Sequence, residues 1–588
     1  MEHSEIRERG PSGSSSSSLQ TCSLSIADDP VSLQEEIQNH NPLAQDISKS
    51  IDDQSKIESK KDYKSAIIIK LKYWWWTQGI EQFIIVLYIC LNLGLAIHKF
   101  YDLYNYSELT DYLGLSFCFA RASALIINLN SALLLLPVLR NVLSWLRGTW
   151  VNNYIPIDRS ISLHKMCGLG LLVGTIIHVI SHYINLEKVL RSPIEEIDYY
   201  LNVSKEKQHF TKLYLFYGSV YGLTGHLMVL ILLLMMTSSI EKIKRPMFEI
   251  FYYTHHLFIP YFVLLCFHGY AKLLKSDPQS WMWVIAPMLF YAIERIFRIY
   301  RGNKEVLLAV AKQHPSKVLE LRFKRDNFTF LAGQYLYLNC PFIAQHEWHP
   351  FTITSAPEES FVSVHINIVG NWTGKLYKFL NPNEKLGIIH RDLLKDPNGD
   401  PIFRIDGPFG AASQDVFKYK TAILIGAGIG VTPFSSILKH IKIQIQQNLD
   451  KPPINKIYFL WISREKNSFQ WFSTILGKLE QDNPNDFLQM QTFLTGELEL
   501  EDWNKIVEGM STIDTNEHSD FITGLKSFTM FGRPNFERIF TEISDQHPNE
   551  KIGLFFCGPK TFGKEIQSFC KKFNGYNNCR YQFYKENF

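Results

Sequence analysis

Six histidines lie inside two strongly apolar stretches of the chain, where a titratable ring is costly and usually functional. They are His164, His178 and His182 in the first stretch and His255, His256 and His268 in the second. A neutral imidazole binds haem iron through one ring nitrogen, and two histidines on different helices can hold one haem from both faces. The two stretches therefore predict haem sites inside a membrane.

The spacing of these histidines selects two pairs. His164 and His178 lie 14 residues apart, which is about 21 Å along a helix and about 40° short of whole turns, so both rings share one face. His255 and His268 lie 13 residues apart, about 19.5 Å, so their depths match. Their directions differ by about 140°, so we expect either a helix distorted at Pro260 or haems that meet it from different sides. We expect His164 to face His255 near the cytosol, as an inner pair, and His178 to face His268 near the outside, as an outer pair.

Other roles remain open for several polar residues in the apolar stretches. His182 or His256 can replace a neighbouring ligand, and all six rings can instead form structural hydrogen bonds or a proton relay. His226 stands alone in another stretch and is interpreted as structural. Arg121 can extend its charge to the membrane surface. It can also neutralise haem propionates or attract an anionic product.

These residues belong to six apolar segments, each near the roughly 20 residues that a helix needs to cross the hydrocarbon core. The segments cover residues 76–98, 113–139, 163–184, 213–237, 250–270 and 281–299. Tryptophans at their edges are typical of the aromatic belts at membrane surfaces. Buried helices of a large soluble protein are the alternative, and six such segments in close succession argue against it. The sequence therefore predicts a six-helix membrane domain.

Basic residues predict the orientation of this domain. Lysines and arginines gather before the first segment and in the second and fourth loops, and this bias is typical of the cytosolic side. The third loop is of mixed charge. Both termini are then cytosolic, whereas the sequons at Asn105 and Asn202 face outward. Sequons at Asn327 and Asn371 face the cytosol and should carry no glycan.

The chain has 588 residues, a length typical of about three to four domains. Its net charge of +3 is too small to indicate a nucleic-acid partner. Residues 1–65 are rich in serine, glutamine and aspartate and have no apolar leader, so we expect a disordered cytosolic tail. The nine cysteines form no CxxC pair, so the sequence suggests neither a zinc site nor a disulfide framework.

After Arg301 the pattern changes to that of a soluble protein. Short β-rich runs come first, and strands alternate with helices further on. Three apolar runs, 419–426, 456–462 and 551–556, are predicted to be buried parallel strands. This order is typical of an α/β nucleotide-binding domain.

A glycine run follows the first of these strands and opens a helix, which is the context of a dinucleotide-binding turn. Its residues are Gly426, Gly428, Gly430, Thr432 and Pro433. Glycine lets the backbone approach a pyrophosphate, and the helix N-terminus favours the negative charge. The later motif Cys557-Gly558-Pro559 favours a module of the ferredoxin-reductase type.

Discrimination between NADPH and NADH needs a basic group for the 2′-phosphate. Arg464 follows the second predicted strand, and Arg533 stands between a glycine and a proline. Either arginine can bind the phosphate, and either can instead be a solvated surface residue. We expect NADPH.

A hydroxyl-rich segment before this domain has the groups that a flavin needs. It consists of His349, Pro350, Phe351, Thr352, Thr354 and Ser355. Hydroxyl and backbone donors suit the pyrophosphate and the ring edge, and an apolar surface suits the ring face. Taken by itself, the segment also fits an ordinary hairpin.

Together these motifs resemble the NADPH oxidase family over about residues 65–588. The resemblance rests on Leu163–Met166, Tyr253–Phe258, His349–Thr352, Asp406–Gly410, Gly426–Pro433, Cys557–Pro559 and Lys585–Phe588. It implies a ferric-reductase-like six-helix transmembrane bundle over residues 66–302. A ferredoxin-reductase-like module follows, with a β-barrel FAD domain over 303–415 and an α/β NADPH-binding domain over 416–588.

The resemblance implies transmembrane electron transfer from cytosolic NADPH through FAD and two b-type haems to molecular oxygen, generating superoxide. It assigns the four paired histidines as haem ligands and Arg121 to a position beside the outer haem. It adds His365, Ile366 and Thr373 to the flavin site. It also places Phe588 over the flavin ring, where the nicotinamide must enter.

The resemblance further implies a multi-pass protein of the plasma membrane or of a phagosomal or other internal membrane. The implied partners are cytosolic activators, including a small GTPase, and a small membrane subunit. The chain departs from the family in three respects. The loop 271–280 has no cysteine pair, and Asn367 replaces an arginine frequent near the flavin pyrophosphate. The tail contains no EF-hand loop, so we expect no direct control by calcium.

Two other functions compete with the oxidase. A transmembrane ferric or cupric reductase would use the same electron path, and a metal-collecting outer surface would favour it, but the sequence has no dense cluster of that kind. A channel or proton pathway with a regulatory nucleotide-binding domain would contain no haem.

Overall fold

The computed structural model describes residues 74–201, 214–268, 279–314, 316–380, 402–447, 454–481, 487–497, 504, 520 and 522–586. The predicted tail, the sequon at Asn202, most of the loop 271–280 and the terminal Phe588 lie outside these residues. The chain divides into two units, Met1–Lys72 and Tyr73–Phe588, and all described residues belong to the second.

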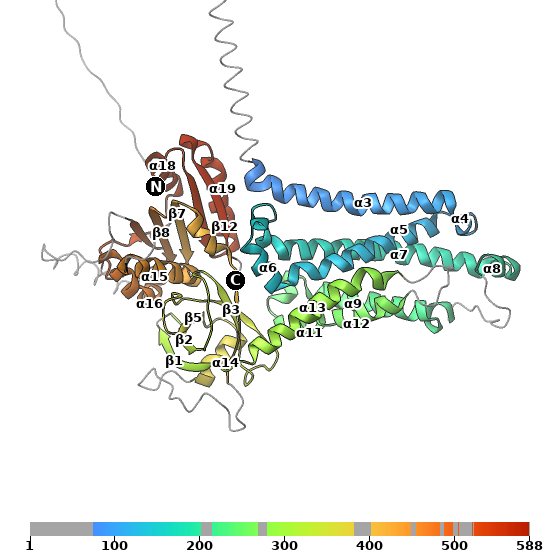
Figure 1. The fold of residues 1–588 in the computed structure, drawn as a ribbon, viewed down its shortest axis with the longest axis horizontal. Coiled ribbons are helices and arrows are strands. Elements are labelled where there is room, and N and C mark those ends of the chain that lie inside the picture. The colour runs from blue at the N-terminus through green and yellow to red at the C-terminus, as the bar shows by residue number, and fades with distance from the viewer. Residues whose placement is uncertain are drawn as a thin grey trace, which may run out of the picture. The chain divides into compact units, whose positions relative to one another are not determined.

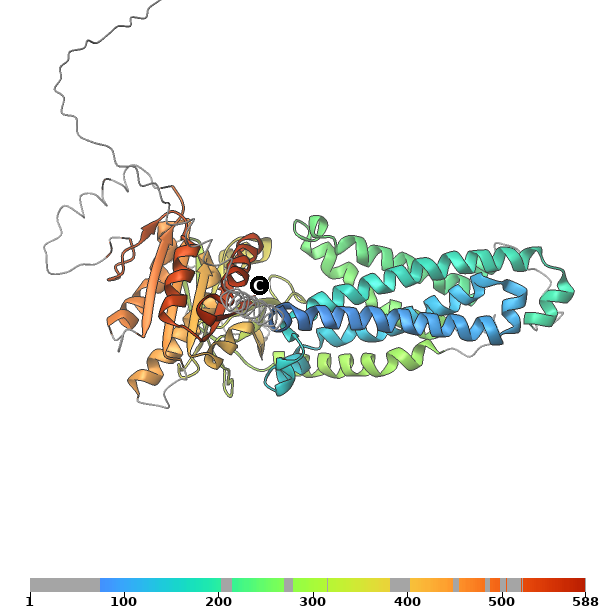
Figure 2. The same ribbon diagram turned by 90° about the horizontal axis from the view of Figure 1, so that it is seen from above.

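Helices build the first half of this unit, and several of them are long and apolar. Their bounds are α3 (Ile80–Tyr106), α4 (Glu108–Leu113), α5 (Leu115–Leu135), α6 (Arg140–Arg147), α7 (Ser160–Arg191), α8 (Ile194–Leu201), α9 (Val220–Ser238), α10 (Glu241–Lys244), α11 (Phe248–His255), α12 (Phe258–His268) and α13 (Ser280–Gly302). Helices α3, α5 and α7 lie side by side in both views (Figures 1 and 2). Ile127 of α5 and Leu171 of α7 belong to an apolar core that also includes Phe262 of α12.

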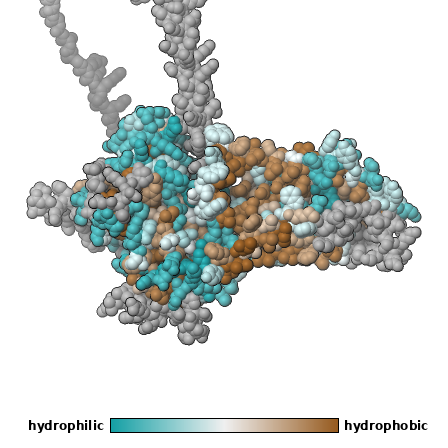
Figure 3. Space-filling view, viewed as in Figure 1, coloured by the Kyte–Doolittle hydropathy of each residue, from teal (hydrophilic) through white to brown (hydrophobic). Residues whose placement is uncertain are grey.

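Five helical segments are long and apolar enough to cross a membrane. They lie in Ile80–Tyr106, Leu115–Val138, Ile157–Arg191, Val220–Ser238 and Phe248–His268. The sixth predicted segment is helix α13, which is not among these five and carries charged residues in its second half. Figure 3 shows an apolar surface over the long helices. Outward residues such as Leu93, Ile97 and Ile180 are exposed, as expected where lipid replaces water.

The fifth predicted segment is a broken helix. Helix α11 ends at His255, residues His256 and Leu257 form a turn, and α12 begins at Phe258. Pro260 has no N–H to donate to the carbonyl of His256, so the helical hydrogen-bond ladder is interrupted here. The structure thus confirms the expected distortion, although it lies a few residues before the proline.

Two three-stranded antiparallel sheets and one helix follow. The sheets are β1-β2-β5 and β4-β3-β6, with strands β1 (Leu307–His314), β2 (Val318–Lys324), β3 (Tyr335–Asn339), β4 (His349–Thr352), β5 (Val362–Asn367) and β6 (Arg404–Phe409). A bridge between Ile353 and Val364 links the two sheets. They enclose one apolar core with helix α14 (Asn371–Leu380), whose Leu376 is fully buried.

The last part is a six-stranded parallel sheet in the order β10-β9-β8-β7-β11-β12. Its elements are β7 (Thr421–Ala427), α15 (Thr432–Gln446), β8 (Lys456–Ser463), α16 (Gln470–Gln481), β9 (Leu488–Leu494), β10 (Met530–Phe531), α18 (Phe536–Gln546), β11 (Lys551–Cys557), α19 (Lys560–Phe573) and β12 (Arg580–Lys585). The three predicted parallel strands are confirmed. Leu424 packs with α15 and α16, whereas Ile423 packs with α18 and α19, because successive strand residues face opposite sides.

Candidate functional site

The structure brings the predicted histidines together in two pairs. The ring centroids of His164 and His255 lie 6.0 Å apart, and those of His178 and His268 lie 6.3 Å apart. A metal–imidazole bond is roughly 2 Å long, so each separation leaves room for one iron between two ring nitrogens. The pairing predicted from helix spacing is thus the pairing observed.

Two of the four rings donate to backbone carbonyls. His164 Nδ1 lies 2.9 Å from the Leu134 carbonyl oxygen, and His178 Nδ1 lies 2.9 Å from that of Ala120. A carbonyl only accepts, so the proton sits on Nδ1 and the Nε2 lone pair remains available. A ligating histidine normally donates its second nitrogen in this way. Both rings are therefore prepared to bind a metal through Nε2.

His268 also has its proton on Nδ1, but it donates this proton to a hydroxyl. Its Nδ1 lies 2.8 Å from Thr224 Oγ1, and that hydroxyl lies 2.6 Å from the Val220 carbonyl oxygen. Because the Thr224 proton goes to Val220, the Thr224 oxygen accepts from His268 Nδ1–H. His255 differs, since its buried Nδ1 has no hydrogen-bond partner among the described residues. Sequence reasoning missed Thr224, although a hydroxyl in an apolar stretch was a visible signal.

The remaining intramembrane groups are arranged differently. His256 is exposed, and its Nδ1 lies 2.7 Å from the Tyr252 carbonyl oxygen of the same turn. His226 is bonded at both nitrogens, to Tyr183 at 2.8 Å and to its own helix. His182 packs edge-on against His178 with centroids 4.5 Å apart. Arg121 follows the Ala120 carbonyl in sequence, at the level of the outer pair, and lies against the Phe117 ring.

The predicted flavin segment offers an aromatic surface. The His349 ring lies 4.3 Å from the Trp372 ring, and Phe351 is stacked 6.1 Å from the same tryptophan. Pro350 is exposed beside them, whereas Thr352 is buried. Trp372, at the start of α14, was not predicted, because only the fold places it under this segment.

The hydroxyls of this segment point inward. Thr354 Oγ1 bonds to Ser363 and to His365 Nδ1 at 2.8 Å, and Ser355 Oγ accepts from the Ser363 N–H at 3.0 Å. Both residues are fully buried. Thr373 Oγ1 accepts from backbone N–H groups of the preceding turn. These hydroxyls therefore fix the segment's backbone, whose N–H groups at Ile353 and Thr354 donate to the carbonyls of Gln334 and Ser363.

Helix α15 clamps the same segment from the nucleotide side. Ser435 Oγ donates to the Thr354 carbonyl at 3.1 Å, and Ser436 Oγ donates to the Ser355 carbonyl at 2.7 Å. All these groups are buried, so each bond is well shielded from water. The two predicted cofactor sites are thus tied to each other through one helix.

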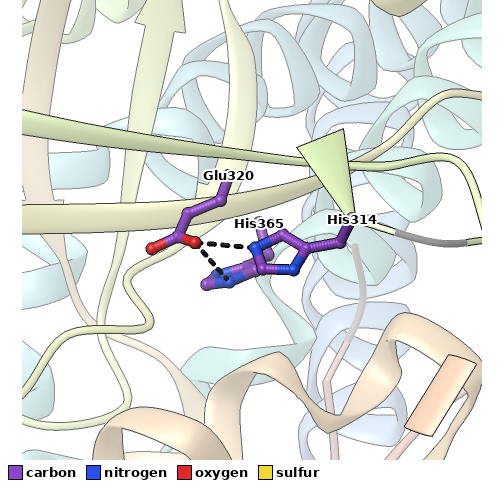
Figure 4. Close-up of side chains that lie close together, drawn as sticks. All are labelled: His314, Glu320 and His365. Atoms are coloured by element: carbon purple, nitrogen blue, oxygen red, sulfur yellow. Dashed lines mark hydrogen bonds and ion pairs between the residues drawn. The ribbon is translucent and has the colours of Figure 1, made fainter. Parts of the chain in front are cut away.

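His365 lies in a buried cluster behind Thr354 (Figure 4). His314 Nε2 lies 2.7 Å from Glu320 Oε2, and His365 Nε2 lies 3.9 Å from the same oxygen. On its other face, the His365 ring lies 4.2 Å from Trp471 of α16. Ile366, also predicted to touch the flavin, is buried and pairs with Leu319 in the sheet.

The charge of the buried Glu320 is balanced by the basic groups around it. Burial lowers the pKa of His365 to about 3, against the opposing charge of Glu320. Burial raises the pKa of Glu320, but the bonds and charges of His314, His365 and Arg322 outweigh it, so the net shift is downward. Two imidazoles and a carboxylate within 4.8 Å are also a zinc donor set. Since Arg322 already pairs with Glu320 at 2.5 Å, we interpret the cluster as a network that orients His365.

The glycine run lies where strands β7 and β11 end side by side. A Cβ on Gly430 would lie 2.3 Å from the Cys557 carbonyl oxygen, and one on Gly558 would lie 2.7 Å from the Ala427 Cβ. Gly428 has a positive φ of 57°. Only glycine fits these positions. Here the strand order reverses direction, which is where open α/β sheets bind nucleotides.

Both candidate arginines lie at the same edge of the sheet. Arg464 follows the last residue of β8, and Arg533 follows β10 by two residues. Because all these strands are parallel, their carboxyl ends share one edge with the glycine run. Both side chains are exposed, so either can meet a phosphate.

The chain's last described residue, Glu586, was not predicted as a site residue. Its carboxylate accepts hydrogen bonds from the Ser413 N–H at 2.6 Å and from the Ser413 hydroxyl. Burial raises the pKa of Glu586 to about 7, against the opposing effect of these two bonds. Its partner Ser413 is 173 residues away in sequence, so no local pattern indicates this contact.

Comparisons with known proteins agree with this arrangement. Family models match a ferric-reductase-like transmembrane component over residues 123–266, an FAD-binding domain over 303–413 and a ferric reductase NAD-binding domain over 419–571. A superoxide-generating NADPH oxidase heavy chain from Dictyostelium discoideum is 56% identical over 544 residues, covering 90% of this chain and 76% of the relative.

Two further relatives extend this result. Another superoxide-generating NADPH oxidase heavy chain from the same organism is 45% identical, covering 88% of this chain and 99% of its own length. NADPH oxidase 1 from Mus musculus is 37% identical, covering 87% and 94%. The chain belongs to the NADPH oxidase family. As a member of this family it is an oxidoreductase with FAD, NADP and haem as cofactors.

The bond between Thr224 and His268 yields a first prediction for this NADPH oxidase. Thr224→Val keeps the shape but leaves the His268 N–H unpaired, and loss of such a partner typically lowers metal affinity about 10- to 100-fold. We expect one haem to be partly lost or to shift its midpoint potential in a redox titration. Thr237→Val is the control, because Thr237 makes the same bond to its own helix, at 2.7 Å to Leu233, on an exposed face. A Thr224→Val titration identical to wild type would contradict the role of this bond.

Glu586 yields a pH prediction. Its pKa rises from 4.5 in the unfolded chain to about 7 in the folded one, so the folded state holds the proton more tightly. This stability is present at low pH and is lost as pH rises through about 7. The thermal midpoint of the intact protein, followed by flavin fluorescence, should fall between about pH 5.5 and about pH 8. Glu586→Gln should flatten this slope, and Glu542→Gln, at an exposed carboxylate, should keep it. Equal slopes in wild type and Glu586→Gln would rule out Glu586 as the titrating group.

Proposed function

We propose that the chain transfers electrons from cytosolic NADPH, through bound FAD and two haems, to molecular oxygen across the membrane, and that it releases superoxide. One observation carries this proposal. Two histidine pairs lie at two depths of the same helices, in a chain that also has flavin and nucleotide domains. Two haems held at these depths would carry electrons through the hydrocarbon core, where the transfer of a charged molecule costs much free energy.

The proposed ligand set determines the product. When bound, FAD accepts a hydride from NADPH and gives up single electrons, and each haem carries one electron at a time. His164 with His255, and His178 with His268, would each hold one haem iron between two imidazoles. A haem held in this way would supply one electron at a time to oxygen without binding it, and superoxide would be the product. Arg121, at the level of the outer pair, supplies positive charge that attracts this anion.

The remaining site residues are proposed in the roles that their positions support. His349, Pro350 and Phe351 with Trp372 would line the flavin ring, beside the backbone from Thr352 to Ser355. Thr354, Ser355, His365, Ile366 and Thr373 would position that backbone. The residues proposed for the NADPH phosphates are Gly426, Gly428, Gly430, Thr432, Pro433, Arg464, Arg533, Cys557, Gly558 and Pro559. Phe588 is proposed to lie over the flavin.

Partners and location are proposed from the family resemblance. Cytosolic activators, including a small GTPase, would control the chain together with a small membrane subunit. It would act in the plasma membrane or in a phagosomal or other internal membrane, with both termini in the cytosol. The proposed domain boundaries are 65/66, 302/303 and 415/416.

The direction of transfer is the central prediction. Sealed right-side-out vesicles loaded with NADPH should reduce external cytochrome c, and superoxide dismutase should abolish the signal. The reason is that the inner pair lies toward the flavin segment, whereas the outer pair lies about 21 Å further along α7. A response that requires external NADPH would show that the orientation is inverted.

The family models favour one alternative, because two of them are described as ferric reductase components. In the same vesicles, an external ferric chelate should not compete with oxygen for the electrons. If the chelate is reduced faster than cytochrome c, and dismutase has no effect, the chain is a metalloreductase.

Cofactor choice gives a separate prediction. Arg464→Gln should lower the preference for NADPH over NADH by at least about tenfold in kcat/KM, because charge-assisted bonds to the 2′-phosphate are lost. Lys466→Gln removes a nearby positive charge and should leave the preference unchanged. Equal losses for both nucleotides in Arg464→Gln would show that this arginine has another task.

A further inference from the structure

We infer, on the electron path proposed above, that Asp406 is a positioning residue for electron transfer from the flavin to the inner histidine pair. It would hold the flavin domain against the cytosolic ends of the membrane helices. Asp406 lies in strand β6, and its partners lie at the end of helix α13, more than 100 residues earlier in the chain.

The contact is a buried ion pair with one arginine on each carboxylate oxygen. Arg298 Nε lies 2.6 Å from Asp406 Oδ2, and Arg301 Nε lies 2.7 Å from Asp406 Oδ1. The aspartate side chain is 2% exposed, and the two arginine side chains are 12% and 17% exposed. The arginines are three residues apart and so share one face of α13. Their fixed planar groups define both the position and the direction of the carboxylate.

Aromatic rings shield this ion pair from water. The Arg298 guanidinium lies 5.5 Å from the centres of both Tyr337 and Phe409, and Arg301 lies 5.0 Å from Phe409. Arg140, at the start of α6, also lies over the Tyr337 ring, at 4.2 Å from its centre. A low local dielectric strengthens the pair and raises the cost of removing one partner.

A row of ring contacts leads from the flavin segment to the inner pair and depends on the same docking. The His349 ring lies 6.4 Å from Phe248, Phe248 lies 5.8 Å from Phe251, and Phe251 lies 5.0 Å from His255. The first step crosses from the flavin domain to a membrane helix. A shift of the flavin domain on α13 would open that step and lengthen the path to His255.

A second contact ties the domains without charge. A Cβ on Gly302, the last residue of α13, would lie 2.9 Å from Trp348 Cη2, just before His349. The flavin segment therefore rests directly on the helix end. Substitution of Gly302 tests the docking by steric means, independently of the ion pair.

The test separates two steps of electron flow in the full chain with FAD and haem bound. NADPH-driven reduction of a soluble dye such as ferricyanide reports on the flavin, and anaerobic stopped-flow absorbance reports on the haems. Asp406→Asn should keep the dye rate within about twofold but slow haem reduction by at least about tenfold. Gly302→Val should act on the same step. Hydrogen exchange at 297–302 and 404–409 should become faster in Asp406→Asn.

Controls make each outcome decisive. Glu542→Gln breaks a comparable but exposed pair, Arg538 to Glu542 at 2.6 Å, and should match wild type in both rates. If Asp406→Asn binds too little cofactor to be measured, Arg298→Lys and Arg301→Lys keep the charge and should show a smaller loss of the haem step alone. Equal losses of dye and haem reduction, or no loss in any of these variants, overturn the positioning role. Absence of haem reduction in wild type would instead refute the electron path itself.

Discussion

The membrane half of this protein depends on how the paired histidines use their ring nitrogens: His164, His178 and His268 bond Nδ1 to the protein and keep the other nitrogen for a metal. His164 and His178 donate Nδ1–H to the carbonyls of Leu134 and Ala120, both of which belong to the α5 region. Their partners therefore come from a helix that carries none of the paired histidines. Both bonds form only if helices α5 and α7 pack closely. The packing of these two helices therefore also decides which nitrogen of His164 and of His178 carries the proton.

In the soluble half too, buried polar side chains bond to other groups of the protein. Thr354 and Ser355 looked like flavin-binding hydroxyls, but their side chains bond to Ser363 and His365. Their carbonyls are held by serines of α15, the helix that opens at the nucleotide turn. The flavin segment and the helix that follows the pyrophosphate turn thus belong to one hydrogen-bond network. Hydride transfer needs the two rings in fixed register, and this network fixes the protein backbone on both sides of that contact.

The sequence predicted the features that follow from regular helices and strands, and it missed those that depend on contacts between distant residues. The depths of His164 and His178 followed from helical rise alone, and the parallel strands followed from continuous apolar runs. The direction of His268 did not, because the break at His256 and Leu257 depends on Pro260 and on packing. The roles of Glu586 and Asp406 were also out of reach. Each depends on a partner more than 100 residues away in sequence, and no periodicity records such a contact.

The charged docking face has a physical reason. A buried ion pair adds little net stability compared with apolar contacts of the same size, because both charges must leave water. Its advantage is geometric, since two arginine bonds on opposite oxygens allow one orientation of the carboxylate, whereas apolar surfaces tolerate sliding. The pair on Asp406 lies beside the contact between Trp348 and Gly302. A contact that sets the distance for electron transfer must fix the orientation of the two parts more than it must bind them tightly. The pair on Asp406 has its charges at the boundary between the flavin domain and helix α13.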